Sequence, residues 1–205
     1  MTSLHEQFRQ PRGAIGHLVG QLMALKNGKR SAWALGLLAP RPGEHVLEIG
    51  FGPGVDVRTL LESVGPKGRV SGVDASDIML RQARARNQRA VRRGQVNLRL
   101  GDAGALPFGH NEFDAALSIN CAQFWPNLSA GFRELMRVVR PAGRIVIAVQ
   151  PMNRGAGLAD AERWGAVLAA TARETGWQDA IAQLGPTSPP VAAMSASKPE
   201  ALANQ

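Results

Sequence analysis

The chain has little cysteine, few acidic residues and no long apolar run. Cys121 is the only cysteine among 205 residues, which excludes an intrachain disulfide and a cysteine-based zinc site, and we expect no metal. No stretch approaches the roughly 18 consecutive apolar residues that a membrane-spanning helix needs. Charged side chains occupy residues 1–10, where a signal peptide would have an apolar core. We therefore expect a cytoplasmic protein without a transmembrane segment.

The shortage of acidic residues is most pronounced in one segment. The chain has 16 Asp and Glu against 24 Lys and Arg, and no acid lies between residues 81 and 99. The arginines of this segment are Arg81, Arg84, Arg86, Arg89, Arg92, Arg93 and Arg99. On a single helix over residues 77–93, those up to Arg93 would cover an arc of about 200°. Such a face suits a polyanion, either RNA or an anionic membrane, or else plain solvation. Because no aromatic residue lies between the arginines to stack on bases, we favour solvation and expect no nucleic-acid partner.

The remaining sequence alternates between two hydrophobic periods. Residues 4–38 have helical spacing, with Ser31 as the expected N-cap of a second helical piece. Short apolar strands are expected at residues 45–50, 69–73, 96–100, 113–119, 144–149, 179–184 and 191–197. Helices are expected at residues 55–64, 77–93, 129–139 and 159–175. This alternation, with 44% apolar residues, predicts an α/β fold with a mostly parallel sheet covered on both faces.

The most informative segment is the turn after the first expected strand, which has the pattern Glu-x-Gly-x-Gly-x-Gly over residues 48–54. Glycine is needed where the backbone takes a positive φ or where a ligand lies directly against it. In an open α/β sheet this turn lies at the carboxyl ends of the strands, where ligands bind. A nicotinamide-dinucleotide turn would need glycine at Val55, and a triphosphate loop would need a following Lys-Ser or Lys-Thr. The turn therefore predicts a ligand of another kind.

With this turn, residues 44–198 resemble the class I S-adenosylmethionine-dependent methyltransferases, especially the group that includes the quinone-biosynthesis C-methyltransferases. The resemblance implies a Rossmann-like sheet of seven strands over residues 44–198. It also implies that residues 1–43 form an N-terminal helical lid over the acceptor pocket. We expect residues 199–205 to be a disordered tail. The implied cofactor is S-adenosylmethionine, with S-adenosylhomocysteine as its product.

The resemblance also assigns cofactor contacts residue by residue. The implied set is Glu48, Gly50, Gly52, Gly54, Asp74, Ala75, Met79, Asp102, Ala103 and Asn120. The glycine turn would cradle the methionine half of the cofactor, and Asp74 would accept hydrogen bonds from the ribose hydroxyls. Met79 would pack on the adenine, Asp102 would accept from its amino group, and the backbone N–H of Ala103 would reach a ring nitrogen.

The segment that follows the fourth expected strand would lie beside the reacting methyl. It begins Asn120-Cys121-Ala122-Gln123 and lacks the Asn/Asp-Pro-Pro-aromatic element of methyltransferases that act on adenine or glutamine. Phe124 and Trp125 are expected either to line an apolar acceptor pocket or to pack in the core.

No residue is singled out as the catalytic base. His17, on the expected lid over the acceptor pocket, is the candidate base and is otherwise a surface histidine. Asn120 is a candidate to orient an acceptor and is otherwise a structural amide.

These observations predict methyl transfer from S-adenosylmethionine to a small, apolar or aromatic metabolite. One alternative is a methyltransferase acting on RNA or on a phospholipid head group, recruited by the arginines of residues 81–99. A second alternative is a non-catalytic subunit that only binds the cofactor. A homodimer is compatible with the sequence.

Overall fold

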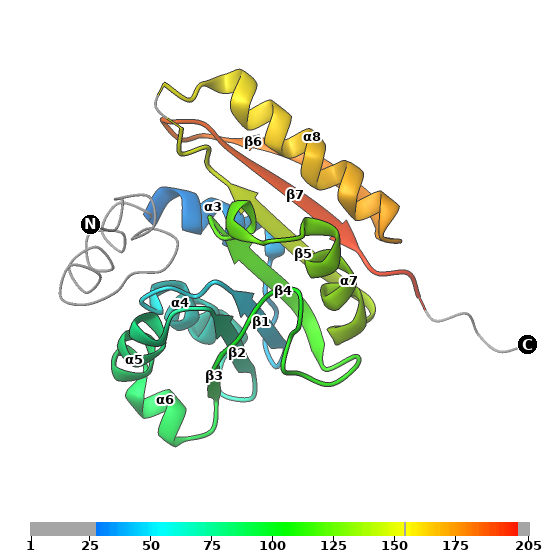
Figure 1. The fold of residues 1–205 in the computed structure, drawn as a ribbon. Helices are drawn as coiled ribbons and strands as arrows, with labels where there is room; N and C mark the ends of the chain where they lie inside the picture. Colours follow the sequence, from blue (N-terminus) through cyan, green and yellow to red (C-terminus); the bar gives the residue numbers. More distant parts are fainter. Residues whose placement is uncertain (1–27, 154, 201–205) are drawn as a thin grey trace, which may run out of the picture.

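The computed structural model describes residues 28–153 and 155–200, which form one seven-stranded sheet with helices on both faces (Figure 1). The strand order is β3-β2-β1-β4-β5-β7-β6. The strands are β1 (His45–Ile49), β2 (Arg69–Asp74), β3 (Val96–Leu100), β4 (Phe113–Ile119), β5 (Val139–Val149), β6 (Gln178–Gly185) and β7 (Val191–Ser197). Only β7 runs antiparallel to its neighbours in this sheet. The predicted α/β class and the mostly parallel sheet are confirmed.

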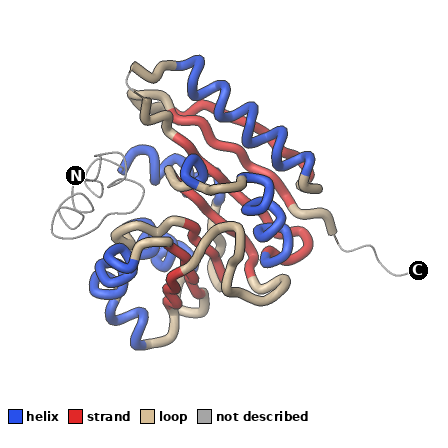
Figure 2. Tube along the Cα trace, in the orientation of Figure 1, coloured by secondary structure: helices blue, strands red, loops and turns tan. Residues whose placement is uncertain are grey.

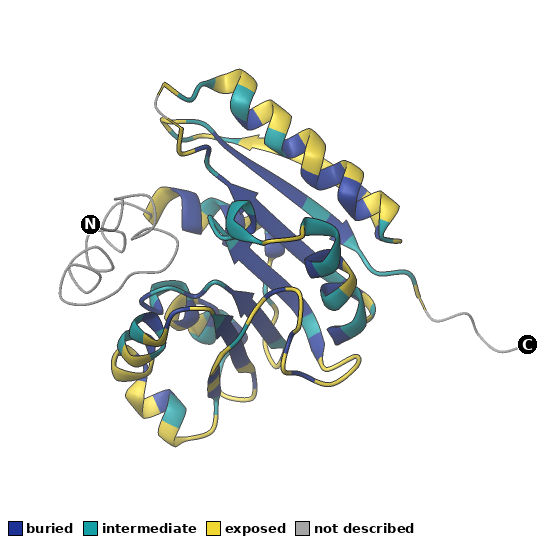
Figure 3. Cartoon of the chain, viewed as in Figure 1, coloured by how far each residue is buried: buried dark blue, intermediate teal, exposed yellow. Residues whose placement is uncertain are grey.

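The helices divide between the two faces of the sheet (Figure 2). They are α3 (Gly28–Leu38), α4 (Val55–Val64), α5 (Asp77–Arg86), α6 (Gln88–Arg92), η1 (Ala122–Phe124), α7 (Leu128–Val138) and α8 (Leu158–Glu174). One apolar cluster joins α3, α4 and α5 to the sheet, and the other joins α7 and α8 to it. The central strands are buried on both sides (Figure 3), which explains why they have near-continuous apolar sequences.

The strand order reverses between β1 and β4. The chain fills one half of the sheet as β1, β2 and β3, and then crosses to β4 on the other side of β1. In open α/β sheets this switch point leaves a crevice at the carboxyl ends of the two strands, and ligands bind there. The glycine turn directly follows β1, so the topology places it in that crevice.

The expected helix over residues 77–93 is wrong in one respect, because the chain breaks it at Asn87 into α5 and α6. The buried Asn87 side chain donates to the carbonyls of Gly54 and Ala83, each at 2.9 Å, and so ends α5. The arginines therefore do not form one continuous helical face. Arg84 donates to the carbonyl of Leu98 at 2.7 Å, so its guanidinium is occupied within the protein.

The expected N-cap at Ser31 is also wrong. Ser31 lies inside α3, where its hydroxyl donates to the Asp56 carboxylate at 2.8 Å. Helix α3 buries Ala34, Leu35 and Leu38 against the sheet, so this part of the segment expected to form a lid is one of the covering helices. Residues 1–27, with His17, lie outside the described residues, as do residues 201–205, and the lid and the tail stay predictions.

The last two expected strands are confirmed as β6 and β7. In the part of the chain that the structure describes, no helix is long and apolar enough to cross a membrane.

Candidate active site

A cavity of about 1200 Å³ opens at the carboxyl ends of the parallel strands. The residues predicted from the sequence that line it are Glu48, Gly50, Gly52, Asp74, Ala75, Met79, Asp102, Ala103, Asn120, Phe124 and Trp125. The structure thus brings the predicted cofactor residues and the predicted acceptor residues into one space. Gly54 lies behind the wall, packed against α5.

All three glycines of the turn have positive φ, 77° at Gly50, 51° at Gly52 and 75° at Gly54. A side chain at Gly54 would place its Cβ 2.7 Å from Ala83 Cβ, so this glycine lets α4 approach α5 closely. Gly52 differs, because no heavy atom of the described residues lies within 4 Å of a Cβ placed there. Gly52 therefore borders open space in the cavity, and a ligand can lie against its backbone.

Asp74 ends β2 and faces this turn. One carboxylate oxygen accepts from the backbone N–H of Gly52 at 2.9 Å, and the other accepts from that of Ser76 at 2.8 Å. Burial raises the pKa of Asp74, and the two N–H donors act in the opposite direction by stabilising the charged form. Each oxygen keeps a second lone pair, so the carboxylate is fixed in place and can still accept from a pair of ribose hydroxyls.

Glu48 lies at the end of β1 beneath the turn and is only 3% exposed. Burial, with a smaller contribution from Asp56 and Asp74, raises its pKa well above the usual value. Its Oε2 is buried and has no hydrogen-bond partner among the described residues. An unsatisfied buried carboxyl oxygen is costly, and the ammonium group at the amino-acid end of S-adenosylmethionine is a suitable partner for it. The residues present therefore fit this cofactor.

The loop after β3 carries Asp102 and Ala103, and local hydrogen bonds shape it. Asp102 Oδ1 accepts from the N–H of Gly104 at 2.7 Å, and the Asp102 carbonyl accepts from the N–H of Ala105 at 3.2 Å. The Asp102 side chain is exposed toward the cavity, while Ala103 is buried in its wall. The loop can therefore present a carboxylate oxygen to an adenine amino group.

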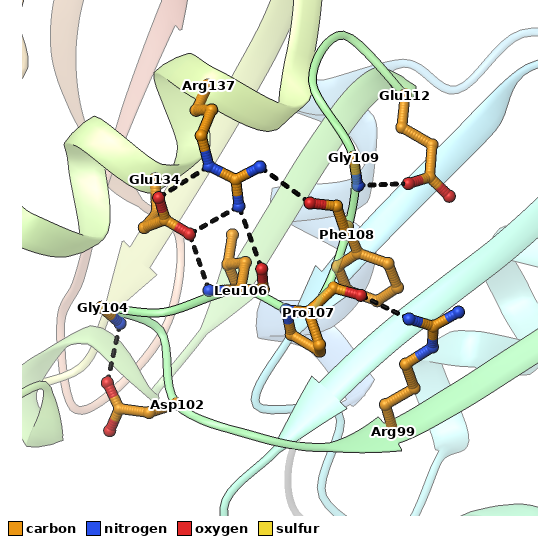
Figure 4. A network of polar contacts seen from close by, with 10 residues as sticks. All are labelled: Arg99, Asp102, Gly104, Leu106, Pro107, Phe108, Gly109, Glu112, Glu134 and Arg137. Carbon is orange, nitrogen blue, oxygen red and sulfur yellow. Dashed lines mark hydrogen bonds and ion pairs between the residues drawn. The ribbon is translucent and has the colours of Figure 1, made fainter.

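A pair of charged residues on α7 clamps the far end of this loop (Figure 4). Glu134 accepts from the N–H of Leu106 at 2.7 Å, and Arg137 donates to the carbonyls of Leu106 and Phe108 at 2.9 and 2.7 Å. The two side chains also bond each other at 2.7 Å, and this hydrogen bond lowers the pKa of Glu134. The clamp ties the loop after β3 to the helix before β5.

The acceptor end of the cavity follows β4. Asn120 Oδ1 accepts from the backbone N–H of Gln150 at 2.7 Å, so the oxygen that was expected to orient an acceptor already supports the protein backbone. Burial raises the pKa of the Cys121 thiol to about 12, and Trp125 Nε1–H donates to its sulfur at 3.4 Å. The thiol therefore stays protonated, and Phe124 and Trp125 give this end an apolar wall.

Sequence reasoning missed several residues that line the cavity. They are Arg30 on α3, Asp56 on α4, Gln150 and Met152 after β5, and residues 185–189 between β6 and β7. A signal existed for some of them. Gln150 directly follows a parallel strand, as Asn120 does, and residues at the carboxyl ends of parallel strands meet at one edge of the sheet. Nothing local marks Arg30, because its position depends on how α3 docks.

Comparison with known proteins places the chain among methyltransferases. Residues 46–143 match the profile of a family described as "Methyltransferase domain". The uncharacterized methyltransferase YdaC of Bacillus subtilis is 26% identical over 79% of this chain and 87% of its own length. A demethylmenaquinone methyltransferase of Desulfitobacterium hafniense is 35% identical over 52% of this chain and 42% of its own length. The chain spans 28% to 46% of the length of the Desulfitobacterium protein and of six other curated relatives, which is less than half of each.

Solved structures share the fold at low sequence identity. A putative methyltransferase in complex with the Haloferax volcanii Trm112 methyltransferase activator superposes with a TM-score of 0.75. It is 18% identical, over 88% of this chain and 94% of that chain. Phosphoethanolamine N-methyltransferase 2 of Haemonchus contortus, solved in complex with S-adenosylmethionine, gives 0.68 at 18% identity, over 83% of this chain and 52% of that chain. The glycine turn, the sheet order and these matches agree, and residues 46–143 form a methyltransferase domain of the class I S-adenosylmethionine-dependent type.

Proposed function

We propose that the protein transfers a methyl group from S-adenosylmethionine to a small, apolar or aromatic metabolite. The observation that carries the proposal is that one cavity has two chemically unlike sets of lining residues. The polar set is Asp74, Asp102 and the glycine turn, and the apolar set is Phe124, Trp125 and Met152. The polar set suits an adenosine, and the apolar set suits an uncharged ring.

The polar set supplies the groups that hold the cofactor. Asp74 accepts from the ribose, Asp102 accepts from the adenine amino group, and Met79 packs against the ring. Glu48 lies under the methionine half, where its buried oxygen faces positive charge. When bound, S-adenosylmethionine supplies a methyl group already activated on a sulfonium.

The contribution of the chain is then to align the acceptor and to exclude water. The described residues that line the cavity include no histidine, and Cys121 keeps its proton. The side chains on this wall therefore favour an acceptor that reaches the site already able to react. Trp125 is held by its contact with Gly131 and by the hydrogen bond to Cys121, so the apolar wall keeps its shape.

The test is a transfer assay with methyl-labelled S-adenosylmethionine and a panel of phenols, quinols and aromatic acids. We expect label to enter an extractable small molecule with the wild-type protein, and much less of it with Asp74→Ala at a cofactor concentration that does not saturate the variant. Labelling of RNA or phospholipid instead would contradict the proposed acceptor class. No transfer to any acceptor by a protein that binds the cofactor would favour a non-catalytic subunit.

A further inference from the structure

An arginine is buried in the wall of the cavity without a carboxylate of the described residues within ion-pair distance. Arg30 lies in the first turns of α3 and is 6% exposed. Its Nη1 donates to Gln150 Oε1 at 2.5 Å, and its Nε is buried with no hydrogen-bond partner in the described part of the chain. Among residues 28–153 and 155–200, no acidic oxygen forms an ion pair with it within 4.0 Å. A buried cation without a counter-ion is costly.

The carboxylate of Asp56 stabilises the positive charge of Arg30, but it compensates only part of that charge. Asp56 raises the pKa of Arg30, but burial lowers that pKa by more. One Asp56 oxygen already accepts from the Ser31 hydroxyl at 2.8 Å, and burial raises the pKa of Asp56. Residues 28–153 and 155–200 therefore leave part of the positive charge of Arg30 uncompensated.

Arg30 is nevertheless held in one position. Gln150, which accepts from it, donates through Nε2 to the carbonyl of Pro189 at 2.5 Å and through its backbone N–H to Asn120. These bonds join α3, the end of β4, the end of β5 and the loop between β6 and β7. A guanidinium that is fixed by its surroundings loses little side-chain entropy when it binds.

We propose that Arg30 binds a carboxylate inside the cavity. The planar guanidinium matches a carboxylate, and such a group would compensate the buried charge. The inference rests on the proposed function, which offers two carriers of a carboxylate: the amino-acid end of the cofactor and an acidic methyl acceptor, such as an aromatic acid.

The first arm of the test measures binding by calorimetry with two cofactor fragments. S-adenosylhomocysteine carries the amino-acid end, and 5′-methylthioadenosine lacks it. If the cofactor carries the carboxylate, Arg30→Gln weakens binding of S-adenosylhomocysteine about 10- to 100-fold and leaves binding of methylthioadenosine unchanged. Arg30→Lys recovers part of the loss. Arg58→Gln, which removes an exposed arginine of α4, serves as the charge-matched control and leaves both affinities unchanged.

The second arm measures melting temperature with benzoate and with its neutral analogue benzamide. If the acceptor carries the carboxylate, benzoate raises the melting temperature of the wild type and of Arg58→Gln, and not that of Arg30→Gln. In that case the affinity for S-adenosylhomocysteine stays the same in all three proteins. Benzamide changes the melting temperature of the wild type and of Arg30→Gln by the same amount.

Either of these patterns supports the inference. The inference is overturned if Arg30→Gln melts at a lower temperature but has the wild-type affinity for S-adenosylhomocysteine and the wild-type melting-temperature shift with benzoate. Arg30 then only stabilises the fold. A wild type that fails to bind S-adenosylhomocysteine contradicts the proposed function. The benzoate arm needs no cofactor, so in that case it decides the inference alone.

Discussion

At the scale of single residues, Glu48 lowers the stability of the free protein in a way that cofactor binding can offset. Its folded pKa is raised above the ordinary value of 4.5, so the native state holds a proton that the unfolded chain releases. The stability from this proton is complete below the ordinary pKa and is lost as pH rises toward the raised pKa. At neutral pH the group therefore costs stability that cofactor binding can recover.

We predict that Glu48→Gln raises the free energy of unfolding at pH 8 by about 1–3 kcal/mol, because the neutral amide needs neither a buried charge nor a proton that the unfolded chain releases. At pH 4 the two proteins should differ less. Urea denaturation at both pH values measures this, and calorimetry should show weaker binding of S-adenosylmethionine to the variant. A variant less stable than the wild type at pH 8 would contradict this account of Glu48.

The turn glycines allow a matched pair of substitutions. Gly52→Ala meets no protein atom within 4 Å but is strained at φ 51°, so we expect a stability loss of about 1–2 kcal/mol. Because its methyl group enters ligand space, binding of S-adenosylmethionine should fall at least about tenfold. Gly54→Ala meets Ala83 at 2.7 Å and should lose more stability. Melting curves and calorimetry separate the two effects, and unchanged binding by Gly52→Ala would show that no ligand lies there.

The clamp on α7 is the clearest case in which one element positions another. Arg137→Lys keeps the charge but loses the fork that reaches two carbonyls, so we expect adenosine binding to weaken by about 1–2 kcal/mol. Arg133→Lys, on the exposed side of the same helix, is the control. The measurement is the affinity for adenosine alone, because adenosine would contact Asp74 and the loop after β3 but lacks the methionine part of the cofactor. Equal affinities of the two variants would mean that the clamp does not position the loop.

The arginines of α5 and α6 can now be divided by what they do. Arg86, Arg89 and Arg92 are exposed, and changing all three to Gln should leave S-adenosylhomocysteine affinity within about twofold. Arg84→Gln alone should cost about 1 kcal/mol of stability, since it loses the bond to Leu98. A salt-dependent affinity for RNA or anionic vesicles that the triple variant abolishes would instead favour a polyanion partner.

Two predictions about helices were wrong, the continuous helix over residues 77–93 and the N-cap at Ser31, and they have one cause. Residues 77–93 have helical spacing, and no local signal shows that Asn87 will reach the Gly54 carbonyl, 33 residues away. Serine is a common N-cap residue, yet the Ser31 hydroxyl donates to the carboxylate of Asp56, which lies on another helix. In both cases a contact distant in sequence outweighed a local preference. The strands were predictable because burial on both faces leaves a continuous apolar pattern.

At the scale of the whole molecule, topology explains which site residues the sequence could predict. Asp74 ends a strand, and Asp102 and Asn120 follow one. The order of strands and helices brings such positions together at one edge. Arg30 belongs to a helix that precedes the sheet, and only its docking against β4 and β5 places it in the same cavity. Residues of this kind become visible only in three dimensions.

The central claim is that this cavity holds S-adenosylmethionine. Calorimetric titration of the full chain with S-adenosylmethionine, S-adenosylhomocysteine and NAD tests it most directly. The account predicts one site for each sulfur compound with a Kd on the order of micromolar and no binding of NAD. It also predicts that Asp74→Ala weakens both by about 1–3 kcal/mol, because the ribose hydroxyls lose a charged acceptor. Absence of binding by both sulfur compounds to folded protein, or equal binding of NAD, would contradict it.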